Sequence, residues 1–240
     1  MSGAPGTRGI PDQLPLGFTL RDRRRFENFV TGANGGAVAS LRGLLDAQSG
    51  GVVLLWGPGG SGKTHLLEAC CADPVLDAEP VAYLPLGDGR MMPEMLNGLA
   101  EVRLLCVDDA DRAAGDPRFE EALFHLYNRA EQSRCPMVLA ARSAPRSPPW
   151  RLPDLVSRLN AAVVWHLREL DDAGRREALK LHARDRGFTL SDEVIAYLMK
   201  HLRRDMVSLT DFLDRLDHSS LAAQRRVTVP FVRALLGAGG

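Results

Sequence analysis

The chain has 240 residues, and its hydrophobic fraction of 45% is ordinary for a globular protein. Its 30 Lys and Arg balance its 30 Asp and Glu, so charge gives no support for a sequence-independent grip on DNA. The longest apolar run, 52–56, is far too short to cross a bilayer, and the first nine residues lack the apolar segment of a signal peptide. The four cysteines show no C-x-x-C spacing, so we expect a reducing compartment, with the cytoplasm as the default.

The first two thirds of the chain alternate short apolar runs with helical patterns. Residues 1–21 are rich in Gly and Pro and are expected to form a flexible tail. The predicted elements follow in chain order: helix 37–47, strand 51–56, helix 65–71, strand 81–84, helix 93–99, strand 102–107, helix 117–132, strand 137–141 and strand 163–167. This alternation predicts an α/β domain over 22–169 with a parallel five-stranded sheet that helices cover on both faces.

The pattern changes in the last third of the chain. Prolines at 145, 148, 149 and 153 interrupt any regular element before it. Helices are then predicted, with no strand between them, over 171–186, 191–202, 205–224 and 230–236. The sequence therefore predicts a small all-helical domain over 170–240.

A phosphate-binding loop is the most specific motif in the chain. The run Gly57-Pro58-Gly59-Gly60-Ser61-Gly62-Lys63-Thr64 matches G-x-x-x-x-G-K-[ST] in full, between a predicted strand and a predicted helix. Its glycines let backbone N–H groups turn toward phosphate oxygens, and the helix adds its positive dipole end. Lys63 is expected to reach the β- and γ-phosphates and Thr64 to bind Mg²⁺. The alternative is a glycine-rich loop that only connects two elements.

Two acidic residues end the third predicted strand. Asp108 is expected to hold the Mg²⁺ shell, and Asp109 to polarise the attacking water. Asp109 is one methylene shorter than the glutamate often found at this place, which shortens its reach to a water. The alternative is a solvated acidic pair that opens a turn, since Asp111 follows closely.

These pieces, in this order, resemble an AAA+ ATPase with a helical lid. The segment 26–34 resembles the entry to the nucleotide domain of the replication initiator DnaA, where it lies beside the adenine base. The resemblance implies a nucleotide-binding set that adds Asn28, Phe29, Val30 and His65 to the loop. The segment 152–159 resembles the DnaA-family motif that carries an arginine finger, which implies that Arg158 stabilises charge on a phosphoryl group held by a neighbouring subunit. The alternative for Arg158 is a weak surface ion pair.

The chain resembles the Hda family of short regulatory DnaA homologues more closely than DnaA itself. The match covers about 22–240, includes 124–129 and 221–226, and leaves no room for a helix-turn-helix domain, so direct sequence-specific DNA binding is not expected. With the DNA-loaded sliding clamp, that family promotes hydrolysis of ATP on DnaA. The residues Gln13, Leu14, Leu16 and Phe18 resemble its clamp-binding peptide, and such an extended segment can dock in an apolar pocket. The alternative is that these apolar residues anchor the tail to the protein's own surface.

Two positions depart from the family pattern. Arg142 stands where a short polar first-sensor residue is usual, and Val207 aligns with the second-sensor arginine of DnaA. Arg203 or Arg204, one turn earlier, could substitute for that arginine. Without a substitute, the chain would hold ADP stably and hydrolyse ATP poorly.

Three functions remain open on the sequence. The leading interpretation is an AAA+ regulator that binds ADP or ATP with Mg²⁺, contacts DnaA and the clamp, and represses re-initiation of replication. The alternatives are an autonomous, helicase-loader-like ATPase and a structural adaptor. No membrane contact is expected, and a homodimer is possible.

Overall fold

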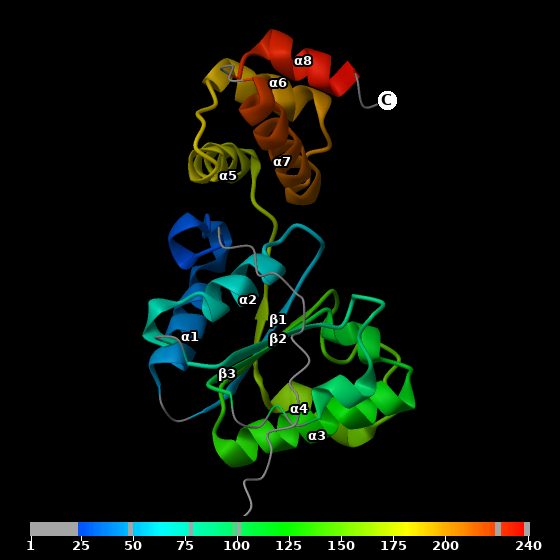
Figure 1. The fold of residues 1–240 in the computed structure, drawn as a ribbon. Coiled ribbons are helices and arrows are strands. Elements are labelled where there is room, and N and C mark those ends of the chain that lie inside the picture. The colour runs from blue at the N-terminus through cyan, green and yellow to red at the C-terminus, as the bar shows by residue number, and fades with distance from the viewer. Residues whose placement is uncertain are drawn as a thin grey trace, which may run out of the picture.

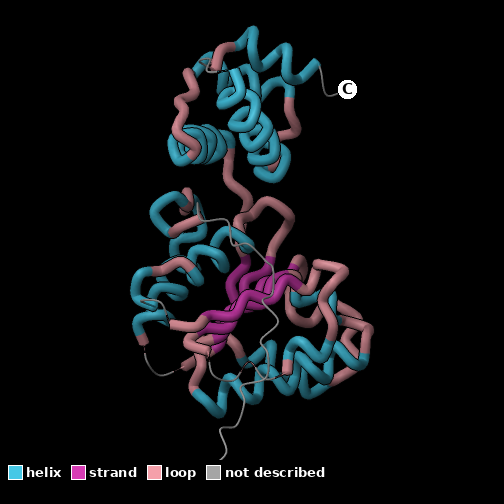
Figure 2. The backbone as a smooth tube through the Cα atoms, in the orientation of Figure 1, coloured by secondary structure: helices cyan, strands magenta, loops and turns pink. Residues whose placement is uncertain are grey.

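The computed structural model describes residues 24–47, 50–76, 79–97, 99, 102–223 and 227–237. Five parallel strands form one sheet in the order β2-β3-β4-β1-β5. The strands are β1 (Val52–Trp56), β2 (Val81–Pro85), β3 (Leu104–Asp108), β4 (Met137–Ala141) and β5 (Val163–His166). The predicted fold class is confirmed, because strands and helices alternate as expected through the sheet and helices alone follow it (Figures 1 and 2).

Helices cover both faces of the sheet (Figure 1). The helices α1 (Gly35–Asp46) and α2 (Lys63–Cys71) bury their apolar sides on one face, and α3 (Pro117–Ser133) and α4 (Pro153–Ala161) on the other. The strands supply both cores because their side chains alternate between the two faces. In β1, Val53 and Leu55 pack toward α1 and α2, and Leu54 packs toward α3 and α4.

The start of α3 shows why the sequence forms a helix there. The Asp116 carboxylate accepts from the backbone N–H groups of Arg118 at 2.9 Å and Phe119 at 3.4 Å, and Pro117 fits the first helical position. At its other end Arg134 turns into the left-handed region, with φ of 55°. Both ends agree with the predicted helix.

Two expectations were wrong. The helix predicted over 93–99 is only a 3₁₀ turn, Pro93–Leu96, which buries the single apolar residue Leu96. Conversely, α4 begins at Pro153, where the prolines suggested an interruption, because a proline at the first helical position costs no hydrogen bond. The remaining 3₁₀ turns that the structure describes are Phe26–Asn28, Gly32–Asn34, Pro74–Leu76 and Ala110–Ala113.

Four helices follow the sheet and form a separate core. They are α5 (Asp172–Asp185), α6 (Asp192–His201), α7 (Met206–Ala223) and α8 (Val229–Gly237). Side chains placed directly before the helices cap them: Asp171 accepts from Gly174 N–H at 2.8 Å and Ser191 from Val194 N–H at 3.3 Å. Leu198 and Phe212 lie in the core of this lid.

The chain between β5 and the lid is fixed at its start by a residue far away in sequence. The Asn34 side chain donates to the carbonyl oxygen of Arg168 and accepts from the Arg168 N–H, both at 2.9 Å. The lid thus follows a residue that belongs structurally to the α/β part. Within the described residues, no helix is long and apolar enough to cross a membrane.

Candidate nucleotide-binding site

The phosphate-binding loop leaves the carboxyl end of β1 and enters α2. In the sheet, β1 lies between β4 and β5, and the chain leaves β1 at its carboxyl end through this loop. Ligands of open parallel sheets usually bind at the carboxyl ends of the strands, where the strand order reverses. Gly62 has a φ of 95°, and a Cβ there would lie 2.5 Å from the ring of Phe29. The segment before α1 therefore packs on the loop through a position that only glycine can fill.

Lys63 is folded back onto the loop in this structure. Its Nζ donates to the carbonyl oxygens of Gly57 at 2.7 Å and Pro58 at 2.8 Å, and lies 3.4 Å from Ser61 Oγ. Burial lowers the pKa of this ammonium, and the nearby carboxylate of Asp108 opposes the shift. The ammonium is thus held at the loop by carbonyl groups, and a phosphate oxygen would take over one of these contacts.

The two predicted metal ligands lie in direct contact, although they are 44 residues apart. Thr64 Oγ1 donates to Asp108 Oδ2 at 2.6 Å, and the Tyr83 hydroxyl donates to the same oxygen at 2.9 Å. Burial raises the pKa of Tyr83, so its hydroxyl stays protonated and remains a donor. A hydroxyl and a carboxylate are hard oxygen donors of the type that Mg²⁺ takes when phosphates and waters complete its shell. The donor set therefore fits Mg²⁺.

Asp109 lies at the end of β3 in an unusual backbone conformation. Its φ is 49°, and a Cβ on Gly87 would come within 2.4 Å of Asp109 Oδ2. Burial, reinforced by the charge of Asp108, raises the pKa of the Asp109 carboxyl. A non-glycine residue at positive φ stores strain that the surrounding structure must hold, and such positions are common in functional sites.

Arg142, at the end of β4, lies beside this carboxylate. Its Nε is 3.8 Å from Asp109 Oδ1, and its backbone N–H donates to Asp111 Oδ1 at 3.1 Å. The structure thus brings the predicted first-sensor position next to the predicted water-polarising residue. The guanidinium of Arg142 thus places a positive charge beside the carboxylate of Asp109.

A pocket of about 940 Å³ joins these residues to the lid. Its volume lies within the range of nucleotide-sized ligand sites. The predicted residues that line it are Asn28, Phe29, Val30, Gly59, Gly60, Ser61, Gly62, Lys63, Thr64, His65 and Asp109. Gly57, Pro58 and Asp108 do not line it; Gly57 and Asp108 are buried, and Pro58 is exposed. Most of the residues that sequence reasoning missed come from the lid, among them His182 on α5, Arg186 directly after α5, and Thr210 on α7.

The lid brings Val207, not an arginine, to the predicted second-sensor position. Val207 is half exposed and lines the pocket, and a Cβ on Gly60 would lie 3.3 Å from the neighbouring Met206 nitrogen. Arg203 pairs with Asp205 at 3.3 Å and Arg204 pairs with Asp172 at 3.1 Å. Neither Arg203 nor Arg204 lines the pocket, so neither replaces the missing arginine in this structure.

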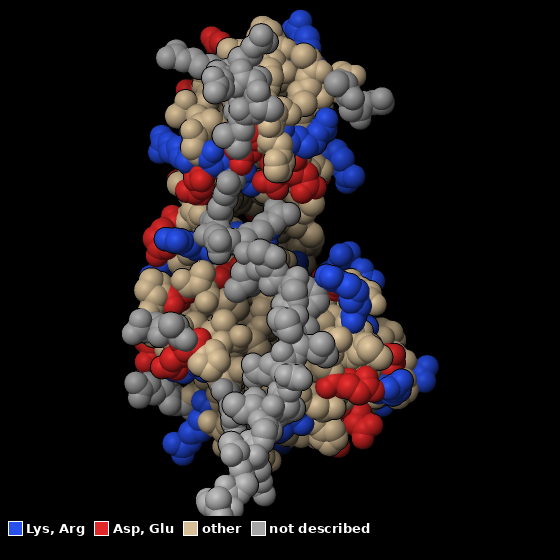
Figure 3. Space-filling view, viewed as in Figure 1, with Lys and Arg blue, Asp and Glu red and all other residues tan. Residues whose placement is uncertain are grey.

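The lid cation at the pocket is instead Arg186, as far as the described residues go. Arg186 is already engaged: its Nη2 lies 2.5 Å from Asp214 Oδ1, and its Nη1 donates to the His182 carbonyl oxygen at 2.8 Å. Figure 3 shows acidic and basic side chains interspersed over the visible face, with neither sign covering a large area of it. That distribution agrees with the net charge of zero.

Two histidines connect α2 to α5 at the edge of the pocket. The rings of His65 and His182 lie 5.7 Å apart, and His65 Nε2 is 3.0 Å from the Arg25 carbonyl oxygen. Close by, the Asn28 side chain donates to Asp185 Oδ2 at 2.6 Å. The predicted base-binding segment therefore contacts both the P-loop helix, through Phe29 against His65, and the lid, through Asn28.

These histidines are expected to make the protein less stable in acid. Burial lowers the pKa of His65 and of His182 from 6.5 to about 4. Each ring is neutral in the folded protein and gains a proton on unfolding when the pH is below 6.5, so acid favours the unfolded state. The free energy of unfolding is therefore unaffected above pH 6.5 and falls as the pH is lowered toward 4. At pH 4.5 we expect a loss of about 2 kcal/mol per histidine, measured by urea unfolding at pH 7 and 4.5. His182→Gln should lose less than the wild type, and the exposed His125→Gln should not differ from it; equal losses in all three would contradict this prediction.

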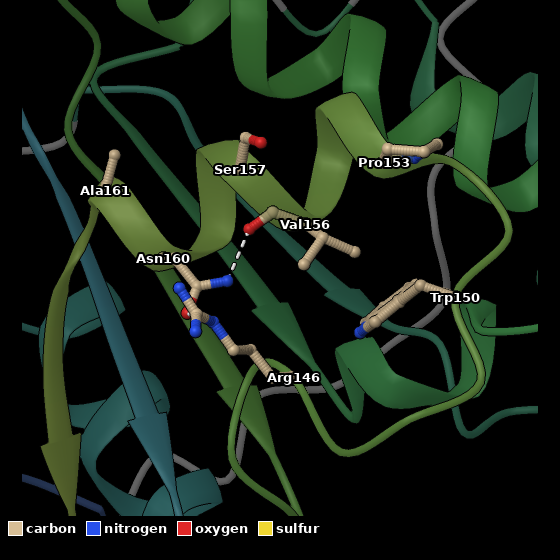
Figure 4. Close-up of a pocket in the computed structure, with 7 residues that line it drawn as sticks. All are labelled: Arg146, Trp150, Pro153, Val156, Ser157, Asn160 and Ala161. Atoms are coloured by element: carbon tan, nitrogen blue, oxygen red, sulfur yellow. Dashed lines mark hydrogen bonds between the residues drawn. The ribbon is translucent and has the colours of Figure 1, made fainter.

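The predicted finger, Arg158, lies away from this pocket. It is exposed on α4, and its Nη1 is 2.7 Å from Glu131 Oε2 on α3. A second cavity, of about 700 Å³, opens beside α4 between Trp150, Arg146 and Asn160 (Figure 4). The clamp-motif residues Gln13, Leu14, Leu16 and Phe18 lie outside the described residues.

The fold is of the AAA+ P-loop type, with a phosphate-binding loop after the first strand of a parallel five-stranded sheet and a helical lid after the sheet. The family model described as "Hda, lid domain" matches residues 172–236. This match confirms the predicted resemblance to Hda in the lid.

Solved structures agree with this class. The chain is similar to domain III of the Thermotoga maritima replication initiation protein DnaA, with a TM-score of 0.77 and 21% identity, over 92% of this chain and 98% of that one. It is similar to the AMPPCP-bound DnaA of Aquifex aeolicus, with a TM-score of 0.68 and 24% identity. This match covers 83% of this chain and 66% of the other, so the chain spans about two thirds of that DnaA. The Thermotoga maritima RuvB Holliday junction branch migration motor matches with a TM-score of 0.64 and 18% identity, over 91% of this chain and 73% of that one. At these identities the likenesses establish the fold.

Proposed function

We propose that this chain is a nucleotide-binding AAA+ regulator that acts with the DNA-loaded sliding clamp. In this role it promotes hydrolysis of the ATP bound to DnaA and so represses re-initiation of chromosome replication. Its own nucleotide, ADP or ATP with Mg²⁺, holds the α/β part and the lid in one arrangement. DnaA and the clamp are its partners.

The position of Arg158 is the single observation that carries this proposal. The residue is exposed on α4 and lies outside the pocket of its own chain, so a phosphoryl group that it contacts belongs to another subunit. An arginine finger supplied in this way neutralises charge in the transition state of phosphoryl transfer. The match of the lid to that of Hda supports DnaA as the protein that holds the nucleotide.

The nucleotide that this chain itself binds has a structural role in the proposal. The loop with Lys63 would bind the phosphates, and Thr64 with Asp108 would hold Mg²⁺. Asn28, Phe29 and His65 would lie against the base, because they line the same pocket. The Aquifex DnaA was solved with AMPPCP, which supports a nucleotide in a site of this fold.

The clamp is proposed to bind the segment 13–18. A glutamine followed by spaced apolar residues can dock as an extended peptide in an apolar pocket. Attachment of this segment to a clamp on DNA would raise the local concentration of Arg158 near DnaA on the same DNA.

The proposal is tested by following ATP on DnaA directly. DnaA loaded with labelled ATP is mixed with this chain and with a clamp loaded on DNA, and the rate of ATP loss is measured. We expect the wild-type chain to accelerate the loss. Deletion of 13–18 is expected to lower that acceleration at least about tenfold at sub-saturating protein, because the effective concentration is lost.

Deletion of 2–7, a segment of equal length outside the motif, is the matched control and should leave the acceleration unchanged. A wild-type chain that leaves the rate of ATP loss unchanged would overturn the proposed function. Unchanged clamp pull-down after deletion of 13–18 would remove the clamp-binding role of the tail.

The intact Thr64–Asp108 contact favours a second candidate, an autonomous ATPase that remodels a replication partner. The geometry around Asp109 indicates that such an enzyme would be slow. Its carboxylate lies 3.8 Å from the Arg142 guanidinium, and this pairing competes with polarisation of an attacking water. Steady ATP turnover by the chain alone, at a rate unchanged by DnaA and the clamp, would favour this candidate.

A further inference from the structure

One buried carboxylate connects the helix of the proposed finger to the rest of the α/β part. Glu120 on α3 is 0% exposed, and its carboxylate accepts only from backbone N–H groups among the hydrogen bonds of the described residues. Oε1 accepts from Gly115 at 2.7 Å and Arg151 at 3.0 Å, and Oε2 accepts from Arg151 at 2.8 Å and Leu152 at 2.7 Å. A buried charge is costly without such donors, so Glu120 fixes the two residues that lead into α4.

The chain needs this carboxylate at the start of α4. Leu152, the residue before the helix, has no side chain that could cap it. A negative charge near the first turn also interacts favourably with the helix dipole. Glu120 therefore supplies from α3 a capping function that the sequence of α4 lacks.

The other end of α4 is also attached to α3, at the finger residue itself. The Tyr127 hydroxyl donates to the carbonyl oxygen of Arg158 at 3.1 Å, and the tyrosine is 2% exposed. Tyr127 follows Glu120 by seven positions, which places both on one face of α3, two turns apart. The Arg158 guanidinium donates a hydrogen bond to the carboxylate of Glu131, which lies one further turn along α3.

Packing holds α4 from one side only. Leu155 and Leu159 are buried toward α3, at 0% and 1% exposure. The cavity with Trp150 and Val156 opens beside the helix (Figure 4). The hydrogen bonds to α3 therefore act together with the packing of Leu155 and Leu159 to fix the direction of α4.

We propose that Glu120, with Tyr127, is a positioning residue that sets the direction in which Arg158 points toward the nucleotide of a partner. This inference rests on the proposed function. An arginine finger acts only when its guanidinium meets the transferring phosphoryl group, and a displacement of about 1 Å can cost two orders of magnitude in rate. Neither Glu120 nor Tyr127 touches a nucleotide, so both act through Arg158.

The test compares Glu120→Gln and Tyr127→Phe with Glu121→Gln, an exposed neighbour on α3, as the control. A glutamine in place of Glu120 would turn an N–H₂ group toward backbone donors, and phenylalanine would remove only the hydroxyl. We expect the maximal rate of DnaA-bound ATP hydrolysis to fall on the order of tenfold for Glu120→Gln and about threefold for Tyr127→Phe. The concentration of the chain at half-maximal stimulation should not change.

Amide hydrogen exchange of the full chain provides a readout that does not need DnaA. Exchange is expected to become faster at 151–161 in Glu120→Gln, while ADP affinity stays at the wild-type value. If Glu120→Gln loses ADP binding through misfolding, Tyr127→Phe alone decides the question.

The two proposals fail in different ways. A wild-type chain that does not stimulate DnaA overturns the proposed function before any variant is compared. Wild-type stimulation that both Tyr127→Phe and Glu120→Gln retain in full would overturn the positioning role and leave the proposed function standing.

Discussion

Lys63→Ala is expected to weaken binding of ADP and ATP by about 100-fold or more. The variant removes a charged donor to the phosphates, and such contacts are worth roughly 1.5–3 kcal/mol each. In this structure the ammonium is held at the loop by the carbonyl groups of Gly57 and Pro58, so little ordering is needed when a phosphate arrives. Affinity is measured by titrating a fluorescent ADP into the protein.

Lys200→Ala is the matched control, because Lys200 is an exposed lysine on α6 outside the pocket. The thermal midpoint provides a second measurement. ADP should raise it for the wild type and for Lys200→Ala, since a ligand stabilises the folded state that binds it, and should raise it much less for Lys63→Ala at the same ADP concentration. Equal ADP affinity of Lys63→Ala and the wild type would place the nucleotide elsewhere.

Arg158→Ala is expected to lower the stimulation of DnaA-bound ATP hydrolysis by about 1,000-fold, which is the low end of the effect of an arginine finger. The ion pair between Arg158 and Glu131 is exposed, and such pairs contribute little to stability. The variant should therefore keep its fold and its ADP affinity while it loses stimulation. The measurement is the rate of ATP loss from DnaA with a loaded clamp.

Arg151→Ala provides the control for this variant. Arg151 is exposed and directly precedes Leu152, and its contact with Glu120 uses the backbone N–H, which alanine retains. Stimulation should therefore be retained when Arg151 is replaced. Full stimulation by Arg158→Ala would instead reduce the chain to an adaptor that brings DnaA and the clamp together.

The sequence was informative where a single local pattern determines the structure. The runs that became β1, β3 and β4 are continuously apolar because both faces of these strands are buried, and their bounds differ from the predicted ones by two residues at most. The helix predicted over 93–99 failed because a proline and one buried leucine sufficed for a 3₁₀ turn only. The helix α4 was missed because its start depends on Glu120, which lies more than thirty residues earlier.

The candidate site divides in the same way. The motif predicted that Lys63, Thr64 and Asp108 act together, and the structure brings Thr64 and Asp108 into contact. The lid side of the pocket could not be predicted, because His182 and Arg186 carry no motif and reach the site only through packing of α5 on the α/β part. Likewise, sequence offered Arg203 or Arg204 as the second sensor, whereas both form ion pairs with other residues and neither lines the pocket.

The paired hydrogen bonds of Asn34 with Arg168 have a consequence for motion of the lid. Because Arg168 is fixed to the α/β part at both its N–H and its carbonyl group, any reorientation of the lid must pivot within 169–171. Such a short connection lets the lid rotate but limits how far it can move away from the α/β part. A nucleotide in the pocket, which the P-loop lines on one side and α5 and α7 on the other, would therefore favour one angle of the lid over others.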